Sequence, residues 1–183
     1  MADYVITTDS NSDVLPEFIK ENDLTVIPQY YAFGDTVYGD ELNMEPHEFY
    51  ETMRNGELPK SMANNPAVIR ERFEKILKEG KDILHIAFSS ALSGSCNNVM
   101  MTANELMEDY PDRRIVVFDS LNASLGEGVS VYRAVELWKA GKTMDEVYDV
   151  LMEEREHVNV SFTVNDLNHL QRGGRVSKTT AVV

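Results

Sequence analysis

The sequence contains a single cysteine, and its acidic residues greatly outnumber its basic residues. Cys96 cannot form a disulfide within the chain. The chain also does not begin with the basic and apolar regions of a signal peptide, and we therefore expect a reducing, cytoplasmic environment. The 17 Lys and Arg residues oppose 31 Asp and Glu residues, for a net charge of −14. The basic residues form no cluster, which argues against nucleic-acid binding by neutralisation of phosphates.

Long apolar runs and the common enzyme motifs are missing as well. No apolar run reaches the length that spans a bilayer, so we expect no stable membrane insertion. The sequence has no G-x-S-x-G nucleophile elbow and no cluster of His, Cys, Asp and Glu at metal-ligand spacing. Gly126-Glu127-Gly128 is too short for a glycine-rich ATP cradle. These absences predict a protein with no catalytic residues, no metal and no cofactor of its own.

Hydrophobic residues make up 43% of the chain, which is enough for a real core. Strand and helix patterns alternate along most of the sequence. This order predicts an α/β fold with a mainly parallel sheet covered by helices on both faces. Gly34-Asp35 is a plausible hairpin turn, and Thr143 is expected to cap a helix. Strands are expected at 4–7, 24–28, 30–33, 36–38, 82–88, 115–118 and 159–164, and helices at 16–22, 46–54, 66–78, 95–109, 126–139 and 143–156.

Four serines and a glycine follow the strand expected at 82–88; they are Ser89, Ser90, Ser93, Gly94 and Ser95. A strand, a hydroxyl-rich turn and a helix start would place free backbone N–H groups and several O–H donors around one point. The positive end of the helix dipole faces that point, so an oxyanion, a carboxylate or a phosphate is favoured there. A single serine would more often cap the helix. Four hydroxyls within seven residues favour a ligand site.

Two further expected strands are also followed by polar residues, Asp9-Ser10 and Asp119-Ser120. Each Asp-Ser pair alone would more often be a helix cap or a turn former. The carboxyl ends of parallel strands lie along one edge of a sheet, where ligands usually bind. Together with the serine loop, the two pairs therefore predict a polar crevice at this edge.

A serine-dependent acyl hydrolase or transferase is an alternative, with Ser93 or Ser95 as the nucleophile. Such chemistry needs a base within hydrogen-bond reach, usually a histidine. His85 falls within an expected buried strand, where a satisfied core histidine is more common than a catalyst. The other three lie in charged helical segments or near the end of the chain; they are His47, His157 and His169. A ligand-free interaction domain is the remaining alternative.

Five segments carry a resemblance to a known family; they lie at 9–10, 60–66, 89–95, 119–128 and 166–177. Residues 89–95, Ser-Ser-Ala-Leu-Ser-Gly-Ser, are similar to the Ser-Ser-x-Leu-Ser-Gly-Thr/Ser loop of the DegV fatty-acid-binding proteins. Residues 60–66, which begin Lys-Ser-Met, lie where that family has Lys-Thr-Ser-Gln. Residues 166–177 resemble its Leu-x-x-Leu-x-x-Gly-Gly-Arg-Ile-Ser segment. All five segments follow the family order and span nearly the whole chain.

The resemblance implies a two-domain α/β protein that holds a long-chain fatty acid between its domains and has no active site of its own. Hydroxyls of the Thr-Ser segment and of the serine loop would bind the carboxylate, which carries over to Ser61 and Ser93 here. Arg172 and Arg175 are further candidates for contact with the carboxylate or with a docking partner. Some members present the bound acid to a separate ATP-dependent fatty acid kinase, so such a kinase is an implied partner.

The chain departs from the family pattern in two ways. Met62 occupies the second position of the Thr-Ser segment, so one expected hydroxyl is missing. Family members also continue well beyond the equivalent of Val183. We therefore expect residues 1–158 to form the N-terminal domain and residues 159–183 to form the opening segment of a second α/β domain, with 181–183 inside a helix.

Overall fold

The computed structural model describes residues 4–164 and 167–177, and its centre is a four-stranded parallel sheet. The strand order is β2-β1-β6-β7, so the chain starts inside the sheet and adds strands on both sides. Thr7 pairs with Thr25 on one side and with His85 on the other. The strands are β1 (Tyr4–Asp9), β2 (Thr25–Ile27), β6 (Asp82–Ala87) and β7 (Ile115–Asp119).

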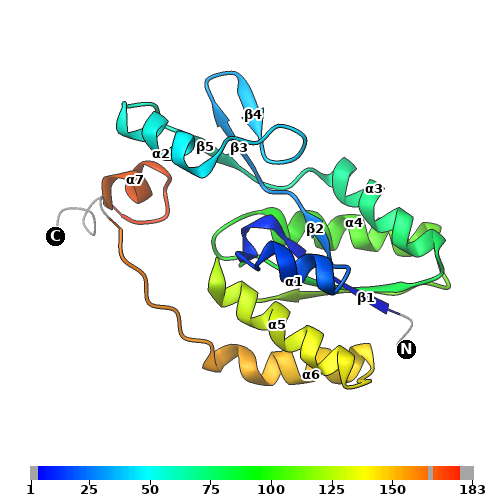
Figure 1. The fold of residues 1–183 in the computed structure, drawn as a ribbon. Helices are drawn as coiled ribbons and strands as arrows, with labels where there is room; N and C mark the ends of the chain where they lie inside the picture. The colour runs from blue at the N-terminus through cyan, green and yellow to red at the C-terminus, as the bar shows by residue number, and fades with distance from the viewer. Residues whose placement is uncertain (1–3, 165–166, 178–183) are drawn as a thin grey trace.

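Helices cover both faces of this sheet, as the alternation of strands and helices predicts (Figure 1). The helices α3 (Pro66–Lys78) and α4 (Ser95–Asp109) enclose one core, which includes Ile69, Phe73 and Leu106. On the other face, α5 (Leu125–Lys139) and α6 (Met144–Glu154) enclose a second core, which includes Ile86, Phe118 and Val131. The short helix α1 (Pro16–Glu21) adds Phe18 and Ile19 to that second core.

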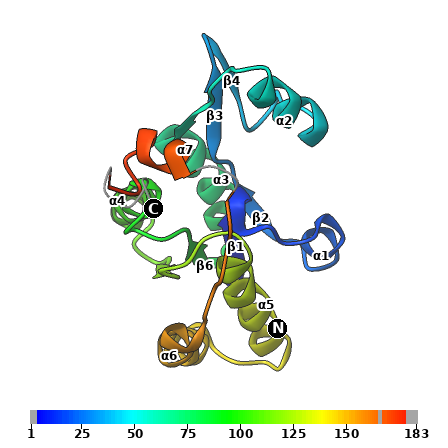
Figure 2. The same ribbon diagram turned by 90° about the vertical axis from the view of Figure 1, so that its left-hand side faces the viewer.

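A smaller antiparallel sheet with order β4-β3-β5 lies at one end of the molecule together with α2 (Figure 2). Its hairpin confirms the turn predicted at Gly34-Asp35, and Gly34 has a φ of 55°. The third strand, which the sequence analysis did not predict, pairs Ser61 with Tyr31. The elements are β3 (Tyr30–Phe33), β4 (Thr36–Tyr38), α2 (Pro46–Arg54) and β5 (Lys60–Met62).

The capping residues explain where several helices begin. Thr143 forms a capping box with Glu146, since the Thr143 hydroxyl accepts from the Glu146 N–H and the Glu146 carboxylate accepts from the Thr143 N–H. The Asn65 side chain accepts a hydrogen bond from the Ala67 N–H at the start of α3, and Pro66 occupies the first turn. The predicted helices at 46–54, 66–78 and 95–109 match the observed bounds, and of these three the helix at 66–78 has a side-chain cap.

The prediction of a strand at 159–164 is wrong. These residues are extended and make no strand pairing, and most of their surface is exposed (Figure 1). A strand needs a neighbour to accept and donate its backbone hydrogen bonds, and the described part of the chain offers none there. The segment follows a short 3₁₀ turn (Arg155–His157) and leads to α7 (Leu167–Arg172). The helix expected through 181–183 lies outside the described residues, and the division into two domains stays a prediction.

Among the described residues, none of the helices has both the length and the apolar character needed to cross a bilayer.

Candidate functional site

The polar ends of β1, β6 and β7 meet at one edge of the parallel sheet, as predicted. The Phe88 N–H donates to Asp9 Oδ2 over 2.9 Å, which joins β1 to the residues that follow β6. Asp119, at the end of β7, accepts from the Ser90 N–H at 3.2 Å and from the Ser90 hydroxyl at 2.5 Å. Asp119 therefore anchors the serine loop at 89–95, and Asp9 holds the residue directly before that loop.

The serine hydroxyls do not all converge on one open point, so that part of the prediction is wrong. Ser89 Oγ accepts from the Ala91 N–H, and Ser90 Oγ donates to Asp119. Ser95 Oγ donates to Gln29 Oε1 at 2.8 Å. The Ser90 and Ser95 protons are therefore given to side chains within the protein, and Ser89 Oγ serves a backbone N–H of the turn. The hydroxyl of the fourth serine, Ser93, bonds to Ser95 at the start of α4.

Ser93 is half-buried and lies directly before the first turn of α4. Its Oγ is 2.9 Å from Ser95 Oγ and accepts from the Ser95 N–H at 3.2 Å. The hydroxyl thus serves the helix start in part, as the capping alternative proposed. Gly94 is the N-cap residue and has no side chain to cap the other N–H groups. The first turn of α4 consequently keeps donors available beside Ser93.

Asn64 connects this loop to the segment that carries Ser61. The Asn64 side chain is 2% exposed, and its amide donates to Asp9 Oδ1 over 3.4 Å. Its backbone N–H donates to Ser95 Oγ, and its carbonyl accepts from the Asn98 side chain. Asn64 and Gln29 were not singled out from the sequence. Asn64 falls within a family-like segment, whereas Gln29 has no sequence signal beyond its position after a predicted strand.

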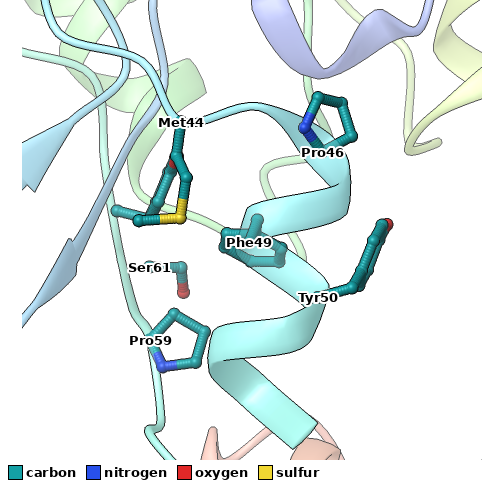
Figure 3. Close-up of a pocket in the computed structure, with 7 residues that line it drawn as sticks. Met44, Pro46, Phe49, Tyr50, Pro59 and Ser61 are labelled. Atoms are coloured by element: carbon teal, nitrogen blue, oxygen red, sulfur yellow. The ribbon is translucent and has the colours of Figure 1, made fainter. Parts of the chain in front are cut away.

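Ser61 lies on β5 and is exposed. It forms part of the wall of a pocket of about 400 Å³, whose other lining residues are apolar or aromatic. Figure 3 shows Phe49 on α2 beside the segment that carries Pro59 and Ser61. The remaining lining residues are Tyr31, Met44, Pro46 and Tyr50. Ser61 is therefore the one serine in a lining that is otherwise apolar or aromatic.

A second pocket of about 470 Å³ shares Pro59 and Ser61 with the first. Lys60, Arg172 and Arg175 also line it, so three cationic side chains surround it in a chain of net charge −14. The structure thus brings Ser61 together with both arginines that the sequence analysis considered. It does not join Ser61 to Ser93 by a hydrogen bond; the two serines are linked through Asn64 and Ser95.

A buried polar cluster lies behind the serine loop. Glu127 on α5 is fully buried, and Thr8 Oγ1 donates to Glu127 Oε1 at 3.0 Å. Burial, followed by the nearby Asp9 carboxylate, raises the pKa of Glu127 to about 9. Its Oε2 has no hydrogen-bond partner among the described residues. The sequence analysis did not identify this cluster, because Glu127 looks like an ordinary acidic residue in the first turn of a helix.

In the described part of the chain, the hydroxyls of the candidate nucleophiles Ser93 and Ser95 bond to each other and to Gln29, and neither bonds to a histidine. His85 is fully buried; its Nδ1 lies 2.9 Å from Thr7 Oγ1, and its Nε2 has no hydrogen-bond partner there. The sequence predicted a core histidine with hydrogen-bond partners, and the structure gives such a partner to Nδ1 but not to Nε2 among the described residues. Burial raises the pKa of the Cys96 thiol to about 12, so Cys96 is not poised as a nucleophile. Within the described ranges, no group of three or more His, Cys, Asp and Glu residues could hold a metal ion.

Sequence comparison relates the chain to curated bacterial proteins. It is 38% identical over 185 residues to a DegV domain-containing protein of Clostridium perfringens, covering 100% of this chain and 64% of that protein. It is 32% identical over 182 residues to a DegV domain-containing protein of Lactococcus lactis, covering 98% of this chain and 63% of that protein. The chain thus spans less than two thirds of the length of these relatives.

Solved structures with the same fold include proteins described as fatty-acid binders. A DegV family protein from Thermus thermophilus, described by its fatty acid binding, superposes with a TM-score of 0.85 at 28% identity, over 98% of this chain and 63% of that one. A stearic-acid-binding protein from Eubacterium ventriosum superposes with a TM-score of 0.84 at 26% identity, over 96% and 61% of the two chains.

The family comparison covers almost the entire sequence. The family described as "Uncharacterised protein, DegV family" matches residues 3–183. This range includes the serine loop, the Ser61 segment and the two arginines of the cationic pocket. The parallel sheet, its flanking helices and the match over residues 3–183 lead to one conclusion: the chain belongs to the DegV family.

Proposed function

We propose that this chain supplies the carboxylate-binding part of a carrier for long-chain fatty acids. The observation that carries the proposal is the position of Ser61 between an apolar, aromatic pocket and a pocket lined by Lys60, Arg172 and Arg175. A fatty acid has the same division into an apolar tail and an anionic head. The fatty-acid-binding descriptions of the structural neighbours support the same ligand class.

The physical chemistry of the two ends differs. An acyl chain gains about 0.8 kcal/mol for each methylene that it buries, so the tail can supply most of the affinity. The carboxylate must then find donors, because an unpaired buried charge is costly. In our proposal these donors are the hydroxyls of Ser61 and Ser93 and the N–H groups at the start of α4.

The first experiment identifies the ligand. Native mass spectrometry of the purified chain should show a population with added mass, and organic extraction should release a long-chain fatty acid from it. Ligand-free protein that fails to take up added hexadecanoate in the same measurement would contradict the proposal.

The second experiment tests the head-group donors. Ser93→Ala should weaken hexadecanoate binding by about tenfold or more, because a hydrogen bond to a charged group is lost, while circular dichroism remains unchanged. Ser90→Ala is the matched control in the same loop, since its hydroxyl is bonded to Asp119. Equal losses in the two variants would assign the effect to loop structure and restore the capping interpretation of Ser93.

The proposal extends to the implied kinase partner and to the cell compartment. We propose that the chain acts as a carrier in the cytoplasm and offers the bound carboxylate to a separate ATP-dependent fatty acid kinase, without chemistry of its own. The alternative, a serine-dependent acyl hydrolase, would need a base beside Ser93. The Ser93 hydroxyl instead contacts Ser95.

A further inference from the structure

The Ser93 hydroxyl is the outer end of a short chain of hydrogen bonds that begins at Gln29. Ser95 Oγ donates to Gln29 Oε1 at 2.8 Å, and Ser93 Oγ lies 2.9 Å from Ser95 Oγ. The Asn64 N–H also donates to Ser95 Oγ, and the Ser95 N–H donates to Ser93 Oγ. Each hydroxyl has one proton and two lone pairs, so the direction of every bond in this chain can be assigned.

The proton count places the Ser93 proton inside the protein. Ser95 gives its own proton to Gln29, so the bond between the two hydroxyls must use the proton of Ser93. Ser93 Oγ then has one free lone pair, because its other lone pair accepts from the Ser95 N–H. A lone pair repels a carboxylate. In this arrangement Ser93 is able to accept a hydrogen bond from a ligand but not to donate one.

We propose that Gln29 is a positioning residue that lets this chain reverse when a carboxylate binds; the inference rests on the proposed function. A half-turn of the Gln29 side-chain amide exchanges its oxygen and nitrogen. Nε2 then donates to Ser95 Oγ, Ser95 donates to Ser93, and Ser93 donates outward to the carboxylate. In that state Ser95 accepts from Asn64 and Gln29, and Ser93 accepts twice from Ser95, so every lone pair of both hydroxyls is used.

The surroundings of Gln29 fit this role. Its backbone N–H donates to Ser10 Oγ at 2.9 Å, which fixes the main chain from which the side chain extends. Gly39 packs against the Gln29 carbonyl so closely that a Cβ at position 39 would lie 2.2 Å from that oxygen. Gln29 Nε2 is buried and has no partner among the described residues. The amide therefore holds an unused donor beside the hydroxyl that it would serve.

Two substitutions of similar shape separate the donor and acceptor functions of the amide. Gln29→Glu can only accept at neutral pH, so it holds the Ser95 proton and leaves Ser93 facing the ligand with a lone pair. Gln29→Met retains no strong acceptor, and the Ser95 proton is free to turn to Ser93. We expect Gln29→Glu to bind hexadecanoate about tenfold or more weakly than Gln29→Met. A residue that only packs would give the opposite order or no difference.

A double-mutant cycle distinguishes this mechanism from simple charge repulsion, and head-group selectivity tests whether the loss of affinity is specific to the acid. Hexadecan-1-ol can donate its hydroxyl proton to the Ser93 lone pair, so Gln29→Glu should keep its affinity for the alcohol while losing affinity for the acid. In a Ser95→Ala background the hydrogen-bond chain is cut, and the difference between the Gln29→Glu and Gln29→Met variants should fall to about threefold or less. A difference that persists without Ser95 would indicate direct repulsion and overturn the inference.

The outcomes also separate this inference from the proposed function. If the wild-type chain binds neither probe, both the function and the role of Gln29 are wrong. If the wild type binds hexadecanoate and the Gln29→Glu and Gln29→Met variants bind it equally, the function stands and the inference fails. Circular dichroism and melting curves check that each variant is folded. If Ser95→Ala does not fold, Ser93→Ala takes its place in the cycle, because it removes the outer hydroxyl of the same hydrogen-bond chain.

Discussion

At the scale of single residues, the polar groups near the sheet edge divide into those that hold the structure and those with capacity for a ligand. Asp119 accepts a hydrogen bond from the serine loop, and Asp9 accepts one from Phe88 directly before the loop, so both act as anchors. Ser61 and Ser93 are the residues that we propose to form hydrogen bonds with a ligand. The sequence identifies both kinds of residue as polar, but it contains no record of which donor meets which acceptor, since that depends on contacts between distant segments.

Glu127 supports a prediction about pH at this scale. Folding raises its pKa from the ordinary 4.5 to about 9, so between these values the folded state keeps a proton that the unfolded state releases. Stability from this group is complete below the unfolded pKa and falls as the pH rises toward the folded pKa, by up to about 1.4 kcal/mol per pH unit. Glu127→Gln cannot ionise, so its free energy of unfolding relative to wild type should rise with pH.

Urea unfolding at about pH 5, 7 and 9 measures this difference. The exposed Glu153 provides the control, and Glu153→Gln should differ from wild type by the same amount at each pH. The prediction allows for Asp9 and Asp13, whose charges also act on Glu127 and are present in both proteins. A Glu127→Gln effect that does not change with pH would show that Glu127 ionises normally in the folded chain.

At the scale of helices and strands, the sequence predicts elements whose signals are local. The helix at 66–78 has an Asn cap, a proline in its first turn and one apolar face, and its observed bounds agree with the prediction. The strand β5 was missed because its three residues are all exposed and show no apolar alternation. The strand β5 forms because it pairs with β3, which lies far from it in the sequence. The prediction of a strand at 159–164 was wrong for the opposite reason. These residues have local β-propensity, but no neighbouring strand pairs with them in the described part of the chain.

The packing of α5 against the end of β1 gives a prediction at the element scale. A Cβ at Gly128 would lie 2.5 Å from the Ser12 carbonyl oxygen and 3.6 Å from Val14 Cγ2. Gly128→Ala must therefore push α5 away from the turn at Ser10–Ser12, and we expect a loss of about 1–3 kcal/mol in the free energy of unfolding.

Gly94 is the matched control for this substitution. Its φ is −71°, and a Cβ there would meet nothing within 4 Å. Gly94→Ala should change the free energy of unfolding by no more than about 0.5 kcal/mol. Chemical denaturation of both variants tests the pair, and equal stabilities would mean that α5 can shift without cost.

At the scale of the whole molecule, Ser93 and Ser95 bond to no histidine within the described residues, and the sequence has no glycine-rich ATP cradle. We therefore expect the purified chain alone to turn over neither acyl esters nor ATP. Hydrolysis of a nitrophenyl acyl ester and release of phosphate from ATP measure the two activities. Activity that disappears in Ser93→Ala would favour the hydrolase alternative. Activity that Ser93→Ala retains would point to a contaminant or to a different site.

The exposed apolar side chains lead to the last prediction. Leu125 and Val129 lie one turn apart on α5 and are 63% and 52% exposed, and Phe162 in the extended segment is 78% exposed. The segment approaches the start of α5, because a Cβ at Gly126 would lie 2.5 Å from Val160 Cγ2. A contiguous apolar surface formed by these side chains would mark a contact site. We therefore expect the 183-residue chain to self-associate in sedimentation and to bind an apolar fluorescent dye.

Substitution of Leu125 and Phe162 by serine should reduce both the association and the dye fluorescence without lowering the melting temperature, since neither side chain belongs to either core. Val37→Thr is the control: Val37 is 45% exposed, but it lies on β4 in the small sheet, at the other end of the molecule from α5 (Figure 2). A monomer that binds no dye would show that these side chains are dispersed rather than contiguous. An equal response to Val37→Thr would place the contact surface on the small sheet instead, beside the pocket that carries Ser61.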